Sequence, residues 1–386
     1  MRGGIQVDVA RRIGEDVAGK WADEVDRDAR FPTEAADEMR SAGLLGALLP
    51  PAWGGPGAGL EEMAGAVAAI SEHCASSGLV LAMHSIQVAC LVRHGSLAAM
   101  EKLAPRLAAG DLLLANANSE VGLGGERRSS LCALEEAPGG FRIDKQAATV
   151  SYGEHADGIL ATARRGPDSA PHDQVLAVCV PPGTTFEPSG DWDTLGLRGT
   201  CSRPGRLVAT VPPELVIEDY ATVFVRTALP VSTVLLGSVW LGLAESAARR
   251  SHSAVRQRAR KERSAAAAGA APPVAALRLA ELAVELHQLR EVIRGGAVDY
   301  ETHKDTAEVE TLQFSARMDN VKLSSSSLAT SIVPRAMSIC GLDGYRNHSE
   351  FSVARLARDA MAAPLMVNND RSLQASAQAL LVRKQL

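Results

Sequence analysis

The sequence predicts an α+β, mainly α fold in three parts: an N-terminal helical domain over residues 1–115, a middle antiparallel β-barrel or sandwich domain over 116–222, and a C-terminal four-helix bundle over 223–386. Two observations support this prediction. The outer parts are rich in alanine and leucine at helical spacing, and both residues lose little side-chain freedom in a helix. The middle part holds short apolar runs bounded by Gly, Pro, Asp and Asn, which is typical of strands.

The N-terminal part alternates helical patterns with short breaks. Phe31-Pro32-Thr33 begins one helix, and the proline- and glycine-rich stretch 50–57 predicts a loop. A long apolar helix follows and is expected to end at His94-Gly95, because glycine commonly follows the last turn of a helix.

Runs bounded by turn residues predict the strands of the middle part, at residues 112–118, 141–143, 158–163, 174–180 and 206–211. Apolar residues at helical spacing predict the bundle helices, at residues 235–260, 273–295, 306–329 and 372–383.

Composition excludes several classes of function. The formal net charge of −5 argues against a nucleic-acid partner, which would need a basic face. The six cysteines are scattered without CxxC spacing, so neither a metal site nor a disulfide framework is expected. The polar N-terminus lacks the apolar core of a signal peptide, and no run approaches the roughly 18 apolar residues of a membrane span. A cytoplasmic protein without a membrane partner is therefore expected.

Four short strings identify a family. They are GLDGY at 341–345 with RLARDA at 355–360, WDTLGLRGTCS at 192–202, SEVGLGGE at 119–126 and EHAD at 154–157. They resemble the GGxGY…ERxxRDA segment, the W-x-x-LG-x-R-x-T-x-S turn, the TEPGAGSD loop and the A-D strand entry of the acyl-CoA dehydrogenases. The order and rough spacing also match, so the resemblance covers essentially the whole chain.

The resemblance implies a site where the β domain and the bundle clasp FAD, with an acyl thioester of CoA or of an acyl or peptidyl carrier protein beside it. Ser119 and Ser151 would take the hydroxyl positions near the flavin ring. The competing interpretation of each serine is a turn or strand-end residue that satisfies local backbone. Further cofactor contacts are expected at Gly124, Thr149, Gly341 and Gly344. Relatives assemble as homodimers or homotetramers, and the same is expected here.

The largest departure concerns the catalytic base. Family dehydrogenases carry a glutamate shortly after the RDA string, and this carboxylate removes the α-proton of the thioester. Val367 stands at that position and cannot take a proton. Asp370, three residues on, is one substitute. Glu262, near the place where some relatives put the base on a bundle helix, is another, although an exposed charge is the competing interpretation.

The cofactor contacts are weakened as well. Thr149 stands where the family has an aromatic residue, Ser338 where it has a glutamine, and alanines replace a Phe-Gly pair. Each loss removes a stacking surface or donor worth about 1 kcal/mol. FAD is therefore expected to be weakly bound or lost, with Tyr152 as a replacement aromatic surface.

The substrate side is expected to be lined by Gln87, Tyr345, Val367 and Asn369. His84 is the third catalytic candidate, because it lies in an otherwise apolar helix with Gln87 at i+3 on the same side. Two polar groups on such a face are costly unless something polar meets them. The competing interpretation of His84 is a core histidine with its hydrogen bonds satisfied.

Three functions stay open. The first is a flavin-dependent dehydrogenase acting on an acyl thioester or a related small molecule, as the family most often is. The second is a flavin-dependent monooxygenase on the same fold, which needs no glutamate. The third is a flavin-poor thioester-binding lyase or isomerase, or a non-catalytic subunit.

Overall fold

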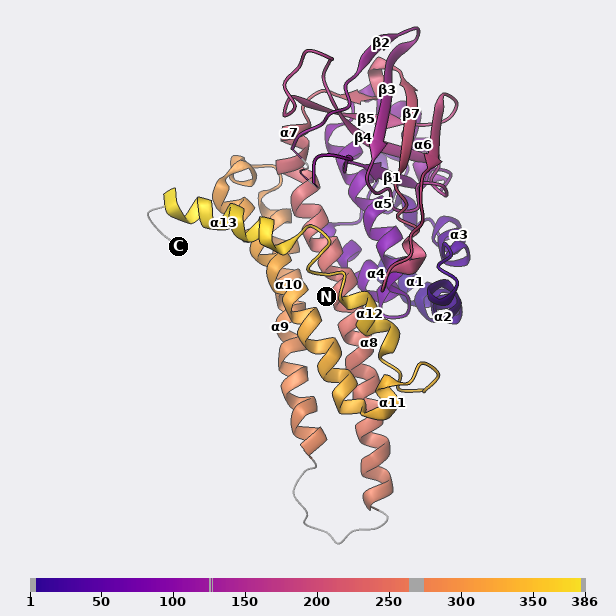
Figure 1. Cartoon of the computed structure of the whole chain (residues 1–386), viewed down its shortest axis with the longest axis vertical. Helices are drawn as coiled ribbons and strands as arrows, with labels where there is room; N and C mark the ends of the chain where they lie inside the picture. The colour runs from indigo at the N-terminus through magenta and orange to yellow at the C-terminus, as the bar shows by residue number, and fades with distance from the viewer. Residues whose placement is uncertain (1–4, 125, 127, 264–273, 383–386) are drawn as a thin grey trace.

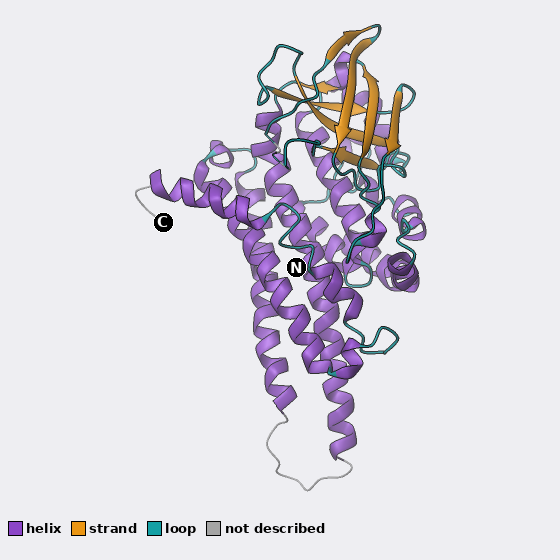
Figure 2. Cartoon of the chain, in the orientation of Figure 1, coloured by secondary structure: helices purple, strands orange, loops and turns teal. Residues whose placement is uncertain are grey.

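The computed structural model describes residues 5–124, 126, 128–263 and 274–382 (Figure 1). Helices form both ends of the chain and strands form the middle (Figure 2). The predicted α+β, mainly α fold class is thereby confirmed. The domain boundaries at 115/116 and 222/223 stay predictions.

Six helices form the N-terminal part. They are α1 (Ile5–Ile13), α2 (Gly19–Arg27), α3 (Thr33–Ser41), α4 (Leu60–Ser71), α5 (Ala75–His94) and α6 (Leu97–Ala108). Helix α5 is buried along nearly its whole length, which explains why its sequence is apolar on every side. It ends at His94 as predicted, and the next residue, Gly95, is extended.

The middle part contains two four-stranded sheets, ordered β1-β4-β5-β8 and β2-β3-β7-β6. The strands are β1 (Leu114–Ala117), β2 (Glu135–Ala137), β3 (Gly140–Ala147), β4 (Gly158–Arg164), β5 (Gln174–Cys179), β6 (Thr184–Pro188), β7 (Gly205–Val211) and β8 (Val216–Ile217). All five predicted strands are present. The antiparallel prediction is wrong for one pair, because β1 and β4 run parallel. Strands β2, β6 and β8 were not predicted, since they are short and carry little apolar pattern.

The C-terminal part is built on three long helices, α8 (Leu229–Arg263), α9 (Val274–His303) and α10 (Leu312–Cys340). They run side by side away from the β domain (Figure 1). The shorter elements are α7 (Tyr220–Val223), α11 (Leu342–Tyr345), α12 (Ala354–Ala360) and α13 (Asn369–Val382). Helix α13, the fourth predicted bundle helix, lies across the others instead of along them (Figure 1).

The N-terminal helices and the bundle share one core. Helix α8 crosses α4 at Gly242, where an added Cβ would lie 2.4 Å from the carbonyl oxygen of Ala68. Only glycine allows the two backbones to approach so closely. Helix α5 and the segment around residues 220–260 are long and apolar enough to cross a membrane, but 89% and 83% of their most apolar windows are buried inside the protein. Their apolar surface is covered by other parts of the chain.

Candidate functional site

A pair of hydroxyl side chains marks the edge of the β domain. Ser119 follows β1, and Thr149 follows β3. The Oγ of Ser119 lies 3.0 Å from the carbonyl oxygen of Thr149 and accepts from the Thr149 amide at 3.1 Å. The two hydroxyl oxygens are 3.1 Å apart, and this pair is exposed. The structure therefore brings two predicted cofactor residues, 30 positions apart in sequence, to one place.

A buried ion pair fixes the loop that carries Ser119. Lys145 Nζ, fully buried, donates to Glu120 Oε2 at 3.1 Å and to the carbonyl oxygen of Thr162 at 2.8 Å. Glu120 also accepts from the amide of Cys132 at 2.6 Å and from the hydroxyl of Ser130 at 2.8 Å. Burial alone would raise the pKa of Glu120, but Lys145 and the hydrogen-bond donors outweigh it and hold this pKa below its usual value.

An amide and two aromatic rings that no sequence motif predicted lie next to the hydroxyl pair. Asn118 Nδ2 donates to the hydroxyl of Tyr220 at 3.3 Å, whereas Asn118 Oδ1 is buried without a hydrogen-bond partner among the described residues. The rings of Tyr220 and Phe224 are tilted, with centroids 6.1 Å apart. Phe224 begins a π-helical turn that ends at Ala228, and such turns are frequent at functional sites. The i, i+4 spacing of the two aromatics was the available signal.

The segment that leads into α13 approaches the same loop. The guanidinium of Arg371 donates to the carbonyl oxygen of Gly124. Just before it, Asn369 Oδ1 accepts from Lys322 Nζ and, at 3.1 Å, from the hydroxyl of Ser326, both on α10. Val367 is half-buried and has a φ of 51°, a left-handed conformation that is a marked outlier for a β-branched residue.

The two substitute bases are not held at this site. The side chain of Asp370 is exposed, and its backbone amide donates to Asn368 Oδ1 at 2.8 Å, so it lies in the open first turn of α13. The backbone of Glu262 is in the last turn of α8, at the end of the bundle farthest from the β domain (Figure 1). It lies roughly 50 Å along the helix axis from Leu229. The side chain of Glu262 lies outside the described residues.

His84 corrects the expectation of a pocket histidine. Its ring is fully buried, with Nε2 2.8 Å from the carbonyl oxygen of Leu45 and Nδ1 accepting from the Leu114 amide at 3.0 Å. Both nitrogens are therefore used by the backbone, and burial lowers the His84 pKa to about 4. Gln87 is also buried, and its Nε2 donates to the carbonyl of Met83 at 3.2 Å, one turn back in its own helix.

The glycine–tyrosine turn, which was expected to contact the same cofactor as Ser119, lies far from the hydroxyl pair within one chain (Figure 1). Gly341 follows the last residue of α10, roughly 28 Å along the helix axis from Lys322. Gly344 is buried beneath the turn, whereas Tyr345 is 71% exposed. Arg258 of α8 donates to the carbonyl of Ile339 at 2.9 Å and so fixes this end of the bundle.

Ser151 and Tyr152 are likewise not part of the exposed edge. The Oγ of Ser151 is 2.9 Å from the Oγ of Ser202, which in turn is 2.8 Å from the hydroxyl of Thr200. Tyr152 is fully buried and donates to the carbonyl oxygen of Leu114 at 2.9 Å. It therefore cannot offer a replacement aromatic surface, and Thr149 rather than Ser151 is the hydroxyl partner of Ser119.

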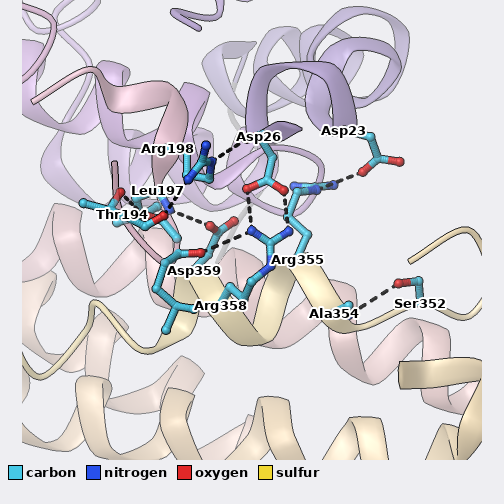
Figure 3. Close-up of polar contacts among 12 residues, drawn as sticks. Asp23, Asp26, Thr194, Leu197, Arg198, Ser352, Ala354, Arg355, Arg358 and Asp359 are labelled. Atoms are coloured by element: carbon cyan, nitrogen blue, oxygen red, sulfur yellow. Dashed lines mark hydrogen bonds and ion pairs between the residues drawn. The ribbon is translucent and has the colours of Figure 1, made fainter. Parts of the chain in front are cut away.

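The RLARDA string joins all three parts of the chain (Figure 3). Asp359 Oδ1 accepts from the amide of Leu197 at 2.6 Å, inside the WDTLGLRGTCS turn. Arg358 forms a two-pronged ion pair with Asp26 of α2, and Arg355 Nε lies 3.0 Å from Asp23 Oδ1. Burial raises the pKa of Asp359 to about 6, although Arg355 opposes this shift.

The residues at the edge fit the polar rim of a flavin. A flavin ring offers both donors and acceptors, and Ser119, Thr149 and the unpartnered Oδ1 of Asn118 offer the complementary groups. Gly122 and Gly124, with φ of 94° and 55°, hold the adjoining loop in conformations that bring its backbone to the surface. We name Asn118, Ser119 and Thr149 the hydroxyl–amide rim.

Comparison with known proteins agrees with this architecture. The acyl-CoA dehydrogenase N-terminal domain model matches residues 6–111, and the C-terminal domain model matches residues 222–366. Acryloyl-CoA reductase (NADH) of Anaerotignum propionicum is 32% identical over 31% of this chain, and mitochondrial isovaleryl-CoA dehydrogenase of Pongo abelii is 29% identical over 50% of it. These matches span 30% and 46% of the two relatives' own lengths.

Solved structures share the whole fold. FMN-bound TdsC of Paenibacillus sp. A11-2, a dibenzothiophene monooxygenase, superposes with a TM-score of 0.82 at 21% identity, over 98% of this chain and 97% of TdsC. Butyryl-CoA dehydrogenase of Megasphaera elsdenii also gives 0.82, at 20% identity, over 99% of this chain and 100% of that one. With both family models and the complete fold in agreement, this chain belongs to the acyl-CoA dehydrogenase superfamily.

Proposed function

We propose that this chain is a flavin-dependent oxidoreductase that oxygenates a small molecule, and that it does not desaturate an acyl thioester through a carboxylate base. The proposal rests on Val367, an aliphatic residue that, by the motif resemblance, takes the place of the glutamate of the superfamily's dehydrogenases. Asp370 is exposed, and the backbone of Glu262 is at the remote end of α8, so neither substitutes for it.

The two reactions differ in what they demand of the protein. Desaturation requires a carboxylate within hydrogen-bond reach of the substrate α-carbon. For oxygenation, the reduced flavin and molecular oxygen supply the oxidant, and no protein carboxylate is needed at the substrate. The structural likeness to TdsC, a monooxygenase, shows that this fold accommodates the second type of reaction.

Within this proposal, the hydroxyl–amide rim holds and orients the flavin. Ser119 and Thr149 supply hydroxyls, and Asn118 supplies an acceptor that has no other partner among the described residues. The rings of Tyr220 and Phe224 exclude water behind Asn118. Val367 and the partly buried Asn369–Lys322 contact would lie on the side of the flavin that faces α10. FAD was the expected cofactor and TdsC binds FMN, so the proposal extends to either flavin.

The first test asks whether flavin binds and what reoxidises it. Purified protein should be yellow or should bind added FAD or FMN, and with reduced flavin it should consume oxygen faster when a substrate is present. Under anaerobic conditions, short- and medium-chain acyl-CoA should not bleach the oxidised flavin. Bleaching by any of these thioesters would overturn the oxygenase proposal, and failure to bind either flavin would favour the flavin-poor lyase, isomerase or subunit.

A matched variant sharpens the test. Val367→Glu supplies the missing carboxylate, whereas Val367→Gln supplies a similar shape without a base. If a thioester fits beside the flavin, Val367→Glu alone should gain acyl-CoA-dependent bleaching. A wild-type protein that already bleaches, and loses this in Asp370→Asn, would instead identify a thioester dehydrogenase with a relocated base. This second candidate is favoured by the sequence likeness to isovaleryl-CoA dehydrogenase.

The proposal also includes the oligomeric state, the cellular location and the substrate donor of this chain. A homodimer or homotetramer is supported by apolar side chains on outer faces of α9 and α13, of which Val284 and Leu373 are more than half exposed. A cytoplasmic location and an acyl or peptidyl carrier protein as substrate donor stay expectations. Light scattering on the purified chain tests the oligomer, and a monomer at micromolar concentration would contradict it.

A further inference from the structure

A second, strongly polar cavity lies away from the hydroxyl–amide rim. It has a volume of about 930 Å³ and is walled by α2, the turn at residues 194–198, α8, the loop at 347–352 and α12. None of the rim residues Asn118, Ser119 and Thr149 lines it, nor does Val367. The RLARDA brace of Figure 3 forms one wall, with Arg355 and Arg358 facing Asp23 and Asp26.

Arginine dominates the charge of this cavity. Six arginines and four carboxylates line it, a formal excess of two positive charges, and the two histidines His73 and His348 are also in the wall. Three of the carboxylates are already paired: Glu72 with Arg249 at 2.9 Å, Asp23 with Arg355 at 3.0 Å, and Asp26 with Arg358. Arg27 and Arg198 pair with Asp28 and Asp193, which lie outside the wall. Among the described residues, Arg250 is therefore the lining arginine left without a carboxylate partner.

Arg250 is the centre of this uncompensated charge. Its guanidinium donates to the carbonyl oxygen of Ser352, and no carboxylate of the described chain lies within ion-pair distance of it. Burial lowers the pKa of Arg250 to about 10, and the neighbouring charges of Arg355 and Arg249 lower it further in the same direction. A desolvated cation beside two like charges is costly unless an anion meets it.

We propose that this cavity binds a phosphorylated small molecule, with the phosphate group held between Arg250 and Arg355. Guanidinium groups match phosphate oxygens in pairs, which gives this ligand class an advantage over a single carboxylate. The volume exceeds what a lone phosphate fills, so the organic part of the ligand has room beside His348 and Asn347. The site goes beyond the proposed oxygenation, because it shares no residue with the rim.

Inorganic pyrophosphate is the probe for this site, titrated by calorimetry against the full-length protein at constant ionic strength. Pyrophosphate should bind saturably, and citrate at equal charge should bind more weakly. Binding should be the same in flavin-loaded and flavin-stripped protein, so failure of the proposed function does not affect this result. No saturable binding, or citrate binding as tightly as pyrophosphate, overturns the proposal.

Two variants with opposite expected effects keep the test decisive. Arg250→Gln should weaken pyrophosphate binding by about tenfold or more, since one charge-assisted contact is lost. Asp23→Asn removes the carboxylate that pairs with Arg355 and should strengthen pyrophosphate binding several-fold. Because the Asp23 side chain is 84% exposed, the substitution should not disturb the fold. Arg206→Gln, which removes an exposed arginine paired with Asp144 in the β domain, is the matched control and should bind as wild type. Wild-type affinity for pyrophosphate in both Arg250→Gln and Asp23→Asn overturns the assignment. If Arg250→Gln fails to fold, wild-type affinity in Asp23→Asn alone overturns it.

Discussion

The carboxylate of Asp359 accepts the backbone amide of Leu197 at 2.6 Å, across 162 residues of sequence. This bond joins the RLARDA helix α12 to the WDTLGLRGTCS turn of the β domain. The contact requires glycine at position 196, where an added Cβ would lie 2.3 Å from the carbonyl oxygen of Arg358. The WDTLGLRGTCS turn and the RLARDA helix, which are separate in the sequence, therefore form one contact between the β domain and the C-terminal part; we call this contact the joint.

Removing the Asp359 carboxylate should loosen this joint. Asp359→Ala leaves the Leu197 amide without its acceptor and removes a negative charge that favours the charged form of Arg355. We expect a loss of about 3 kcal/mol in the free energy of unfolding. Asp359→Asn keeps an acceptor oxygen and should cost about 1 kcal/mol. Urea unfolding followed by circular dichroism measures both. The control is Asp193→Asn, at a carboxylate 87% exposed, which should change stability little, and equal losses in all three variants would contradict the account.

Local patterns were enough to predict most of the fold. The apolar length of α5 and the glycine after His94 are properties of adjacent residues, and the structure confirms that end of the helix. Ser119, Thr149 and Ser151 were all predicted as cofactor residues by resemblance, but the sequence does not say whether Thr149 or Ser151 contacts Ser119. Only the paths of the chain after β1 and β3 decide this.

Long-range burial explains the other errors. His84 and Tyr152 look like functional residues in an apolar context, yet Leu114, on the first strand, satisfies both of them through its amide and its carbonyl. No spacing rule foresees a partner 30 or 38 residues away. Asn118 was missed for the same reason, since its aromatic partner Tyr220 is 102 residues on.

His84 should make folding depend on pH. Burial lowers its pKa to about 4 from the usual 6.5, so between these values the unfolded chain binds a proton that the folded chain does not. Stability is therefore complete above pH 6.5 and is lost as the pH falls toward 4, at about 1.4 kcal/mol per unit. Asp359, whose pKa is raised to about 6, acts in the opposite direction below that pH. Comparison of variants is needed to separate the two.

His84→Gln provides the comparison, because an amide can still donate to Leu45 but does not titrate. Urea unfolding at pH 7, 6 and 5 should show a smaller loss of stability in His84→Gln than in wild type, although the variant starts lower at pH 7. His348→Gln, at an exposed position, is the control and should keep the wild-type dependence. Parallel curves for wild type and His84→Gln would show that His84 is not the titrating group.

Removing one partner of the buried Lys145–Glu120 ion pair should lower the free energy of unfolding more than removing both partners. Lys145→Met leaves Glu120 buried and charged beside Ser130, and we expect a loss of about 3–5 kcal/mol. Glu120→Gln in the same chain removes that charge and keeps an acceptor for the Cys132 amide, so the double variant should be more stable than Lys145→Met alone. Thermal or urea unfolding of the single and double variants measures the coupling. Simple additivity of the two losses would contradict a direct pair.

Backbone strain at Val367 can be measured separately from its side-chain contacts. Its φ of 51° is unfavourable for valine and for alanine but not for glycine. Val367→Ala and Val367→Gly lose nearly the same apolar contacts, so their difference isolates the backbone. We expect Val367→Gly to be more stable than Val367→Ala by about 1 kcal/mol, the reverse of the usual order of these residues. The usual order, with alanine the more stable, would show that the segment relaxes out of the left-handed region.

The hydroxyl–amide rim predicts a sharp contrast between two serines. Ser119→Ala removes a hydroxyl of an exposed pair with Thr149, whereas Ser151→Ala removes one that is bonded to Ser202 at 2.9 Å in a partly buried pair. One hydrogen bond is worth about 1 kcal/mol, so Ser119→Ala should weaken flavin binding about fivefold and Thr149→Val by a similar factor. Ser151→Ala should bind flavin as wild type does. Flavin fluorescence titration of stripped protein measures all three affinities, with melting temperatures to exclude misfolding. If Ser151→Ala weakens binding and Ser119→Ala does not, the flavin edge lies on the Ser202 side of the β domain, and the rim defined by Asn118, Ser119 and Thr149 is not the cofactor site.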